Sequence, residues 1–591
     1  MEKNIVKYIK DALETIYSVD TTKLNISVEK TREGIDGDFT VVVFPFVKFS
    51  KKKPEDTAKD LGVYIKSRFE DIAAYNIIKG FLNLKMTQEY WINRLNDLIT
   101  DKKEVITNPK TLMVEFSSPN TNKPLHLGHI RNNLLGDSVS KILNAAGNNV
   151  IKVNLINDRG IHICKSMLAW MKWGENKTPE DTGIKGDKFV GDFYVLFDQK
   201  YKEQIKMLVE NGMKEDEAKE QAELMQDARE ILKKWESGDP EIRKIWEMMN
   251  TWVYQGFDIT YNRLGISFDK LYYESNTYLS GKDIVKRGLN DKIFVRDEDN
   301  SVWIDLTDEG LDRKILLRSD GTTVYMTQDI GTAFQRFEEF NPDKLIYVVG
   351  NEQNYHFKVL KSILNKLQSG YSERIEHLSY GMVELPEGKM KSREGTVVDA
   401  DDLMDEMIST ARKISEESGK ANDLPENEKE EIIRMIALGA LKYYIIKVDP
   451  KKQMTFNPKE SIDFNGNTGP FIQYTHARIC SILRKAEKMK IKFNGKVSDE
   501  TSLLDCEVEL VAALTEYNNI VSDAAKKLDP GMIANYIYNL VKAYNQFYHD
   551  HSILKEKDSK ILQFRLHLSQ QVANTIKSGM GLLGIEVPEV M

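Results

Sequence analysis

Two histidines three residues apart are the strongest chemical signal in this chain. The pattern His126-Leu-Gly-His129 follows an apolar segment, residues 112–116, and precedes residues 130–145, where apolar side chains recur with helical spacing. A helix start offers unpaired N–H groups and a positive dipole end to phosphate. Two imidazoles on its first turn can hydrogen-bond phosphate oxygens, and Gly128 leaves the backbone open to a nucleotide. The pattern therefore predicts a nucleotide site.

The simpler alternative is a pair of surface histidines at a helix start. In a chain with nine histidines, a chance match to this pattern is on the order of one in a hundred. A second signal lies roughly 260 residues downstream, where residues 388–395 read GKMKSREG. A basic loop between glycines suits a triphosphate and its leaving pyrophosphate. Alone such a loop is usually a solvated surface, but together with the histidines it supports the nucleotide site.

The elements that must position these residues form a βαβ unit. The strand at 112–116, the helix ending near residue 146 and a second strand at 150–156 predict a parallel, doubly wound sheet. Further strand patterns are the segments 344–350 and 377–383. The strand–helix rhythm breaks over about 165–300, where residues 197–237 read as a long charged helical segment with a solvated surface.

Both ends of the chain differ from this middle. Residues 1–100 predict a small α+β unit, with a helix at 1–17, an alternating strand pattern at 39–49, a helix at 58–74 and a strand at 80–86. Residues 100–109 read as a linker. Beyond about residue 430 the pattern is helical and predicts a bundle, with helices at 432–446, 473–489, 507–528, 532–549 and 561–580.

Composition narrows the class of protein. The net charge is −8, so any nucleic-acid contact must use local basic patches. No apolar run approaches the ~18 residues of a membrane span, and the N-terminus lacks a signal peptide pattern, which favours the cytoplasm. Three distant cysteines predict neither disulfides nor a zinc site, so we expect no protein-held metal.

The two motifs together resemble those of class I aminoacyl-tRNA synthetases, in which an amino-acid carboxylate attacks the α-phosphate of ATP. Residues 114–129, VEFSSPNTNKPLHLGH, are similar to the arginyl-tRNA synthetase signature, and residues 323–331 and 350–356 resemble that family's next two blocks. The resemblance implies that arginine is held by Glu115, Asn120, Tyr325, Asp329 and Gln353. It implies that catalysis depends on His126, His129, Lys389, Lys123 and Arg393, and that ATP is bound by Gly128, Gly381, Met382, Val383, Met390, Lys391, Ser392 and His356.

A guanidinium is planar, always charged and offers five N–H donors in a fork. Asp329 is its natural bidentate partner, with Tyr325 as hydroxyl or ring platform, while Glu115 suits the α-ammonium and Asn120 and Gln353 supply amide contacts. Lysine or citrulline would leave buried polar groups unpaired, which discriminates by ~10⁴ or more.

Three points stay open in the sequence. Lys391 stands where the family's basic loop has a serine, so which of Lys389, Lys123, Arg393 and Lys391 carries the phosphate charge is undecided; we rank them in that order. Residues 157–160, NDRG, fit either a site lining or a structural turn. Residues 381–383 could present backbone to adenine, or form a plain buried strand.

The resemblance extends to both ends. Residues 469–483 and 583–591 are similar to the anticodon-binding bundle, and the N-terminal part to the domain that contacts the tRNA elbow. The aromatic series in the bundle reads as core more readily than as a base platform; its members are Tyr536, Tyr538, Tyr544, Phe547 and Tyr548. The expected domains are 1–105 (tRNA-contacting), 106–400 (catalytic, with an insertion at about 165–300), 401–460 (connecting helices) and 461–591 (anticodon-binding).

The expected fold is therefore multidomain α/β: a Rossmann-like doubly wound parallel-sheet catalytic domain with a helical insertion, a small N-terminal α+β domain and a C-terminal all-α bundle. The expected function is ATP-dependent charging of tRNA(Arg) with L-arginine through an arginyl-adenylate, releasing AMP and diphosphate, with Mg²⁺ as counterion of ATP. On family grounds we expect a monomer with no DNA or membrane partner. The rival functions are a cytidylyltransferase-like nucleotidyl transferase, which is typically much shorter, and a non-catalytic tRNA-binding paralogue.

Overall fold

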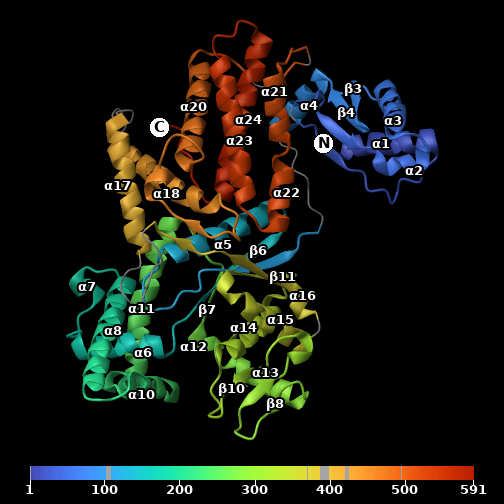
Figure 1. Cartoon of the computed structure of the whole chain (residues 1–591). Helices are drawn as coiled ribbons and strands as arrows, with labels where there is room; N and C mark the ends of the chain where they lie inside the picture. Colours follow the sequence, from blue (N-terminus) through green and yellow to red (C-terminus); the bar gives the residue numbers. More distant parts are fainter. Residues whose placement is uncertain are drawn as a thin grey trace. The chain divides into compact units, whose positions relative to one another are not determined.

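The computed structural model describes residues 2–32, 34–100, 108–368, 370–386, 398–418, 425–493, 495–498 and 500–591. The chain divides into two compact units (Figure 1). The first comprises Met1–Val105, Arg478–Asn519 and Tyr538–Ile576; the second comprises Ile106–Ala477, Ile520–Ile537 and Lys577–Met591. The C-terminal helices thus contribute residues to both units.

A five-stranded parallel sheet forms the centre of the second unit. Its order is β12-β11-β5-β6-β7, with every neighbouring pair parallel. The strands are β5 (Thr111–Glu115), β6 (Asn149–Ile156), β7 (Lys270–Tyr273), β11 (Lys344–Gly350) and β12 (Ile375–Tyr380). The chain runs outward from β5 to β6 and β7, and then outward on the other side to β11 and β12. This is the doubly wound arrangement that the sequence predicts, and the prediction is confirmed.

Helices cover both faces of the sheet. Figure 1 shows α5 (Leu127–Ala145) on one side, and α14 (Tyr325–Phe340) and α15 (Asn354–Leu367) on the other. The central strands β5 and β11 are buried over most of their length, as parallel strands between two helical layers are. Met113, Val153 and Leu345 are fully buried in the core beneath α14 and α15. The predicted strand–helix–strand unit is confirmed.

The predicted insertion contains more than helices. Its helices are α6 (Ile161–Trp173), α7 (Pro179–Thr182), α8 (Gly186–Glu210), α9 (Glu215–Gln221), α10 (Glu223–Ser237), α11 (Pro240–Leu264), α12 (Glu274–Thr277) and α13 (Ser280–Asn290). The charged helical segment predicted over 197–237 is helical, but it is divided among the end of α8, α9 and α10. The chain turns at Gly212, with a φ of +94°, and again at Ala222, with a ψ of 126°. Strand β7 and an antiparallel sheet of β8 (Val295–Arg296), β9 (Val302–Ile304) and β10 (Lys314–Leu317) went unpredicted.

The remaining elements of the second half are mostly helical, and the helical pattern predicted after about residue 430 is confirmed. They are η2 (Thr307–Glu309), η3 (Asn351–Gln353), α16 (Tyr371–Arg374), β13 (Val383–Glu384), α17 (Ala400–Ser418), α18 (Glu426–Ile446), β14 (Met454–Thr455), α19 (Pro458–Ser461), α20 (Gly469–Lys488), α21 (Asp505–Thr515), α22 (Tyr517–Lys527), α23 (Gly531–Asp550) and α24 (Ser559–Leu582). The one helix predicted over 507–528 is two helices that meet at Glu516.

The first unit holds a four-stranded antiparallel sheet of order β1-β2-β4-β3. Its elements are α1 (Glu2–Tyr17), β1 (Val28–Lys30), β2 (Phe39–Val42), η1 (Phe44–Phe46), α2 (Val47–Ser50), α3 (Pro54–Arg68), β3 (Ile72–Ile78), β4 (Phe81–Met86) and α4 (Gln88–Ile99). The small α+β unit is confirmed, with two corrections. The strand predicted to residue 49 ends at Val42, because Pro45 lacks a backbone donor. The helix predicted to residue 74 ends at Arg68, where pairing with β4 draws the following residues into a strand.

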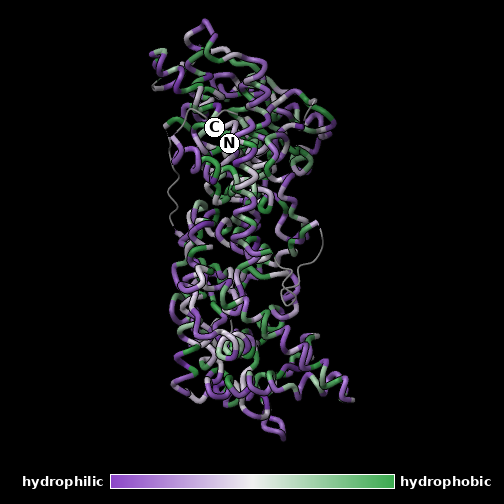
Figure 2. The backbone as a smooth tube through the Cα atoms, turned by 90° about the vertical axis from the view of Figure 1, so that its left-hand side faces the viewer, coloured by the Kyte–Doolittle hydropathy of each residue, from purple (hydrophilic) through white to green (hydrophobic). Residues whose placement is uncertain are grey.

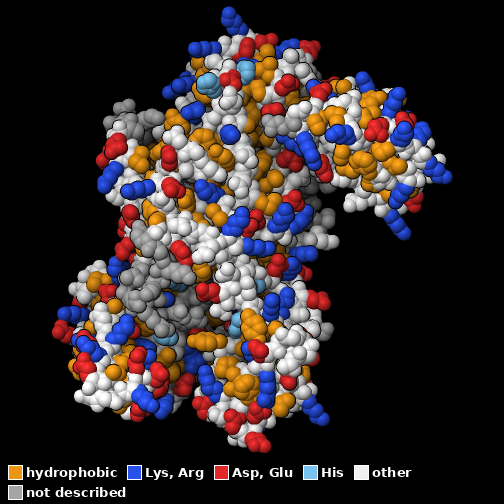
Figure 3. All heavy atoms as spheres, viewed as in Figure 1, with side chains coloured by type: hydrophobic (Ala, Val, Ile, Leu, Met, Phe, Trp, Pro, Cys, Tyr) orange, Lys and Arg blue, Asp and Glu red, His pale blue; other side chains and the backbone are white. Residues whose placement is uncertain are grey.

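Hydropathy along the helices is patterned rather than uniform. Hydrophobic and hydrophilic residues interleave along the tube in Figure 2, which is typical of helices with one buried face. None of the described helices is long and apolar enough to cross a membrane. On the face drawn in Figure 3, acidic and basic side chains are interspersed over both units.

Candidate active site

The histidine pair lies at the start of α5, at the end of the loop that follows β5. His126 is the N-cap of α5, and its Nδ1 accepts a hydrogen bond from the Gly128 N–H at 3.1 Å. Nδ1 of His129 accepts from the His126 N–H at 3.2 Å, so the two rings cap the helix reciprocally. Their centroids are 4.0 Å apart. Both rings are therefore held by the backbone of the turn that carries them.

Burial decides the charge of both rings, and the capping hydrogen bonds decide their tautomer. Burial, and then the charge of Lys123, lowers the pKa of His126 to about 3. Burial and the neighbouring His126 and Lys123 lower the pKa of His129 well below its usual range. Each ring is neutral at pH 7, and each Nδ1 is occupied as an acceptor, so the proton sits on Nε2. The site thus offers two neutral N–H donors at a helix start.

The loop before the histidines is strained and pinned. Ser117 and Ser118 adopt positive φ values of +76° and +43°, a conformation that costs about 1–2 kcal/mol for a side chain other than glycine. Asn132 Oδ1 accepts from the Ser117 N–H at 2.5 Å, and Asn154 Oδ1 from the Ser118 N–H at 3.0 Å. These two amides offset the strain and were not singled out in the sequence, because asparagine within a helix or strand carries no distinctive signal.

The pinned loop brings Asn120 to the end of β6. Asn120 pairs with Asn157 in an isolated parallel bridge, and the Thr121 N–H donates to the Asn157 oxygen at 3.1 Å. Asn120 itself is exposed. Within residues 157–160, for which the sequence left a site lining and a structural turn as alternatives, Asn157 therefore lies beside Asn120 at the edge of the sheet.

Lys123 and the histidines are supported by segments from elsewhere in the chain. A Cβ on Gly191 of α8 would lie 2.8 Å from Cδ of Pro124, so α8 packs closely behind the loop. Residues 398–400 pair with it as well, through Leu127 N–H to Val398 oxygen at 3.3 Å and Ala400 N–H to Leu125 oxygen at 2.9 Å. Lys389, Met390, Lys391, Ser392 and Arg393 lie outside the described residues.

The backbone predicted to face adenine is partly engaged elsewhere. The Gly381 N–H donates to the Pro450 oxygen at 2.9 Å, and the Met382 oxygen accepts from the Met454 N–H at 3.1 Å. A Cβ on Gly381 would lie 2.5 Å from the Gln453 nitrogen, so no other residue fits there. Val383 begins β13, which pairs with β14.

The predicted arginine-binding residues come from the ends of two strands and from one helix, and they share the carboxyl edge of one sheet. Glu115 ends β5, Gln353 follows β11, and Tyr325 and Asp329 lie on the first turns of α14. Tyr325 is 75% exposed. The carboxyl edge is where doubly wound sheets bind ligands, and His126 and His129 lie at the same edge.

Two of these side chains already have protein partners. Glu115 is buried and ion-paired with the fully buried Arg336, and it accepts a hydrogen bond from the Ser118 hydroxyl at 3.0 Å. Arg336 lies between the rings of Tyr272 and Tyr347. Asp329 Oδ2 lies 2.6 Å from Nε2 of His356, so the predicted ATP-binding histidine touches the predicted guanidinium partner.

Glu274 is a carboxylate that sequence reasoning missed. It begins α12, directly after the carboxyl end of β7, and is 8% exposed. Burial, with the charges of Asp158 and Asp329, raises its pKa to about 7, while Arg159 and a hydrogen bond from Gln328 lower it. No feature of the sequence placed Glu274 at the carboxyl edge of the sheet, because the pattern did not predict β7, the strand that precedes it.

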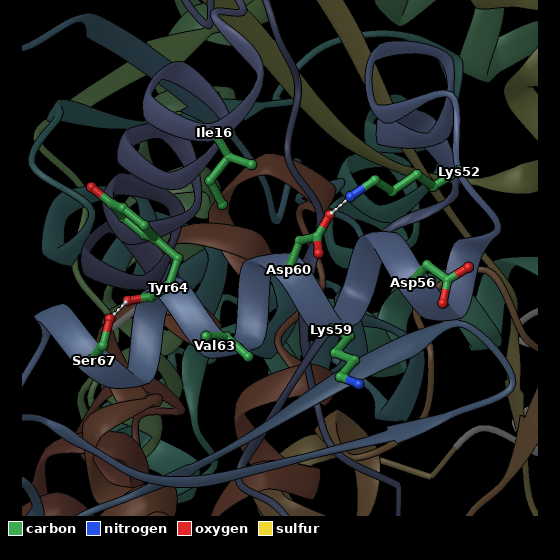
Figure 4. A pocket seen from close by; sticks show the side chains of 8 residues that line it. All are labelled: Ile16, Lys52, Asp56, Lys59, Asp60, Val63, Tyr64 and Ser67. Atoms are coloured by element: carbon green, nitrogen blue, oxygen red, sulfur yellow. Dashed lines mark hydrogen bonds and ion pairs between the residues drawn. The ribbon is translucent and has the colours of Figure 1, made fainter.

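Other hollows and clusters do not add to this site. In the first unit, a hollow of about 810 Å³ lies between α1, α3 and the residues before α3 (Figure 4). Its Lys52 and Asp60 pair with each other at 2.6 Å, and it contains no predicted site residue. Tyr544 and Phe547 of the predicted aromatic series are core. Among the described residues, no group of three or more His, Cys, Asp or Glu side chains could hold a metal ion.

Three family models match successive parts of the chain. They are tRNA synthetases class I (R), catalytic domain, at residues 94–457; DALR anticodon binding domain, at 472–591; and Arginyl tRNA synthetase N terminal domain, at 3–86.

Curated relatives match over the full length. The chain is 55% identical to the arginine–tRNA ligase of Bacteroides thetaiotaomicron over 596 residues and 56% identical to that of Parabacteroides distasonis over 595 residues, covering 100% of both partners in each case. Among solved structures, the arginyl-tRNA synthetase of Thermus thermophilus aligns with a TM-score of 0.78 at 25% identity, covering 100% of both chains. Together with a class I catalytic model over more than half the chain, these matches show that the chain belongs to the arginyl-tRNA synthetases, class I enzymes that charge tRNA with arginine.

Proposed function

We propose that this chain activates L-arginine with ATP at the carboxyl edge of the parallel sheet and transfers it from the adenylate to tRNA(Arg), releasing diphosphate and AMP. The observation that carries the proposal is the meeting, at one sheet edge, of two Nε2–H donors at a helix start and a set of carboxylates. Anionic phosphate and cationic arginine each find complementary groups there.

The phosphate side works by charge stabilisation. The arginine carboxylate attacks the α-phosphorus, the bond to the pyrophosphate oxygen breaks, and negative charge grows on the phosphate oxygens. His126 and His129 donate from Nε2 to these oxygens without changing their own protonation, which preorganised donors do most effectively in a site shielded from water. Lys123, Lys389 and Arg393 supply positive charge toward the leaving diphosphate. The assignment of Lys389 and Arg393 rests on the sequence alone. Mg²⁺ serves as the counterion of ATP.

The remaining nucleotide contacts follow from the same placement. Gly128 has no side chain, so the ribose or purine can approach the backbone there. A Cβ at this position would also lie 2.9 Å from Cε1 of the His126 ring. Backbone groups of the 381–383 segment that do not pair with residues 450–454 are available to adenine. His356 lies beside the nucleotide and orients Asp329. Met390, Lys391 and Ser392 complete the basic loop.

Arginine is held at both ends. Asp329 and Glu274 face the guanidinium, with Tyr325 as platform, since two carboxylates match a planar fork of donors. Glu115 receives the α-ammonium, oriented for this by Arg336, and each of its oxygens retains a lone pair beside its protein partner. Asn120 and Gln353 provide amide contacts. In vivo we expect a monomer acting in the cytoplasm; light scattering at the 68.0 kDa of one chain would support the monomer, and twice that mass would contradict it.

The direct test is arginine-dependent exchange of labelled pyrophosphate into ATP, with and without tRNA, followed by charging of tRNA(Arg). On family grounds we expect exchange only with tRNA present. Lysine and citrulline are the matched controls, since they preserve the backbone and chain but not the guanidinium. Charging with either control at the rate of arginine would contradict the pocket, and no exchange with any amino acid would contradict the function.

A further inference from the structure

Asp158 is a buried carboxylate whose oxygens are all committed to protein donors. It is the second residue after β6 and is 1% exposed. Oδ1 accepts from the Ser275 N–H at 2.8 Å; Oδ2 accepts from the Ser275 hydroxyl at 2.7 Å and the Tyr254 hydroxyl at 3.0 Å. A carboxylate with three such donors holds segments together rather than meeting a substrate.

The backbone around Asp158 is tied down as well. The Trp246 indole N–H of α11 donates to the Asp158 carbonyl oxygen at 2.6 Å. Next to it, Arg159 pairs with Glu236 of α10 at 2.8 Å and lies 4.1 Å from the ring centroid of Tyr278. The end of β6 is thereby joined to α10, α11 and the segment after α12.

The element that Asp158 holds is the one that carries Glu274. Ser275 is the next residue, and two hydrogen bonds from it to Asp158 fix the first turn of α12. The side chains of Gln328 and Asp329, both on α14, act on the pKa of the Glu274 carboxyl. The start of α12 is therefore fixed from the end of β6, and the Glu274 carboxyl lies within electrostatic reach of α14.

We propose that Asp158 is a positioning residue for arginine selection: by holding Ser275 at the start of α12, it keeps the buried Glu274 carboxylate at the carboxyl end of β7, where Glu274 and Asp329 together accept the guanidinium. The inference rests on the proposed function, because it assigns Glu274 to the guanidinium. It predicts that changes at Asp158 alter the use of arginine and leave the use of ATP nearly unchanged.

Electrostatics separate this role from a purely structural one. The groups that act on the pKa of Glu274 are Asp158 and Arg159 from the turn after β6, and Gln328 and Asp329 from α14. Asp158 raises the pKa of Glu274, so Asp158→Asn removes a charge that opposes its ionisation. Because a guanidinium pairs with the carboxylate and not with the acid, kcat/KM for arginine should rise with pH through about 7 in the unchanged protein. In Asp158→Asn the midpoint should move to lower pH.

The test measures tRNA charging by the full chain across this pH range, varying arginine at saturating ATP and tRNA, and then varying ATP. Asp158→Asn should lower kcat/KM for arginine about ten- to a hundredfold, as a misplacement of about 1 Å does, with kcat/KM for ATP within about twofold. Tyr254→Phe and Ser275→Ala remove one donor and keep the charge, so they should lower kcat/KM for arginine less and leave the midpoint in place. The matched control is Asp269→Asn, at the other end of the same strands, where the carboxylate accepts from the Lys152 N–H at 2.7 Å; arginine use should not change.

Each outcome decides something. If the unchanged protein does not charge arginine, the proposed function fails first. If it does, the inference is overturned when Asp158→Asn matches the unchanged protein, when it loses arginine and ATP use equally, or when Glu274→Gln selects arginine normally. If Asp158→Asn does not fold, Tyr254→Phe and Ser275→Ala decide alone, and unchanged kcat/KM for arginine in both would overturn the inference.

Discussion

The substitution Asp329→Asn tests the arginine pocket with least disturbance, because asparagine keeps the shape of the side chain and removes its charge. Oδ2 of Asp329 already lies 2.6 Å from Nε2 of His356, so Oδ1 is the oxygen most available to a guanidinium. The amide retains one carbonyl oxygen, but it is a weaker, uncharged acceptor. The variant should therefore still fold and bind ATP, yet hold arginine poorly.

The expected loss follows from the geometry. A hydrogen bond to a charged group contributes about 1.5–3 kcal/mol, and Oδ1 can accept one or two from a guanidinium. The Asp329 side chain is 36% exposed, which favours the lower part of this range. A loss of about 2–3 kcal/mol corresponds to a fall of about 30- to 200-fold in kcat/KM for arginine. Because the interaction holds substrate before and during the reaction, much of the loss should appear in KM.

The assay is the initial rate of tRNA charging at varied arginine and then at varied ATP. The matched control is Asp343→Asn at the amino edge of the same sheet, where the carboxylate accepts from the Thr111 N–H at 2.8 Å. It should leave both parameters unchanged. The reasoning fails if Asp329→Asn keeps kcat/KM for arginine within about threefold of the unchanged protein, or if ATP use falls equally.

Four further predictions concern the same unit. Arg336→Met leaves Glu115 buried without its cation and should lower the unfolding temperature. Adding Glu115→Gln to Arg336→Met should restore the unfolding temperature but not the charging of tRNA with arginine. A double variant no more stable than Arg336→Met would contradict the pairing argument. His126→Ala removes one phosphate donor and should slow adenylate formation in single turnovers by about 10²- to 10³-fold, with arginine binding unchanged. A loss below about tenfold would show that His126 is not a phosphate donor. Because the pKa of His126 in the folded protein is about 3, the unfolded chain binds more protons than the folded chain between that value and about 6.5. The unfolding temperature should therefore fall as pH drops through this window, and fall less in the double variant His126→Gln, His129→Gln. Equal slopes of unfolding temperature against pH in the two proteins would refute the assignment of neutral rings. Gly136→Ala would place a Cβ 2.2 Å from Cγ of Phe116 and should destabilise by about 1–3 kcal/mol in denaturant unfolding, while Gly581→Ala, with no atom within 4 Å, should not; equal effects would contradict the packing behind the active-site loop.

Local pattern was enough to predict the centre of the fold. Strands β5, β6 and β11 and helix α5 appear in the sequence as apolar runs and helical spacing within a few residues of their bounds. Strand β7 escaped because it has only four residues, Lys270–Tyr273, with little apolar pattern of its own, and it is a strand through pairing with β6. The breaks inside residues 197–237 fall at Gly212 and at Ala222, in a charged stretch that otherwise reads as continuous helix.

The candidate site divides in the same way. Residue types and short spacings sufficed to single out His126, Gly128 and His129, since a helix start is a local feature whose chemistry is visible within four residues. Nothing in the sequence pointed to Arg336 as the partner of Glu115, 221 residues away, or to Asp158 as the anchor of Ser275, 117 residues away. The sequence by itself determined the central strands and helices with a strong pattern of their own, and the types of group at their ends. Only the tertiary structure decided which buried charges meet, because periodicity reports the face of a helix or strand, whereas the partner that neutralises a charge is set by how distant elements pack.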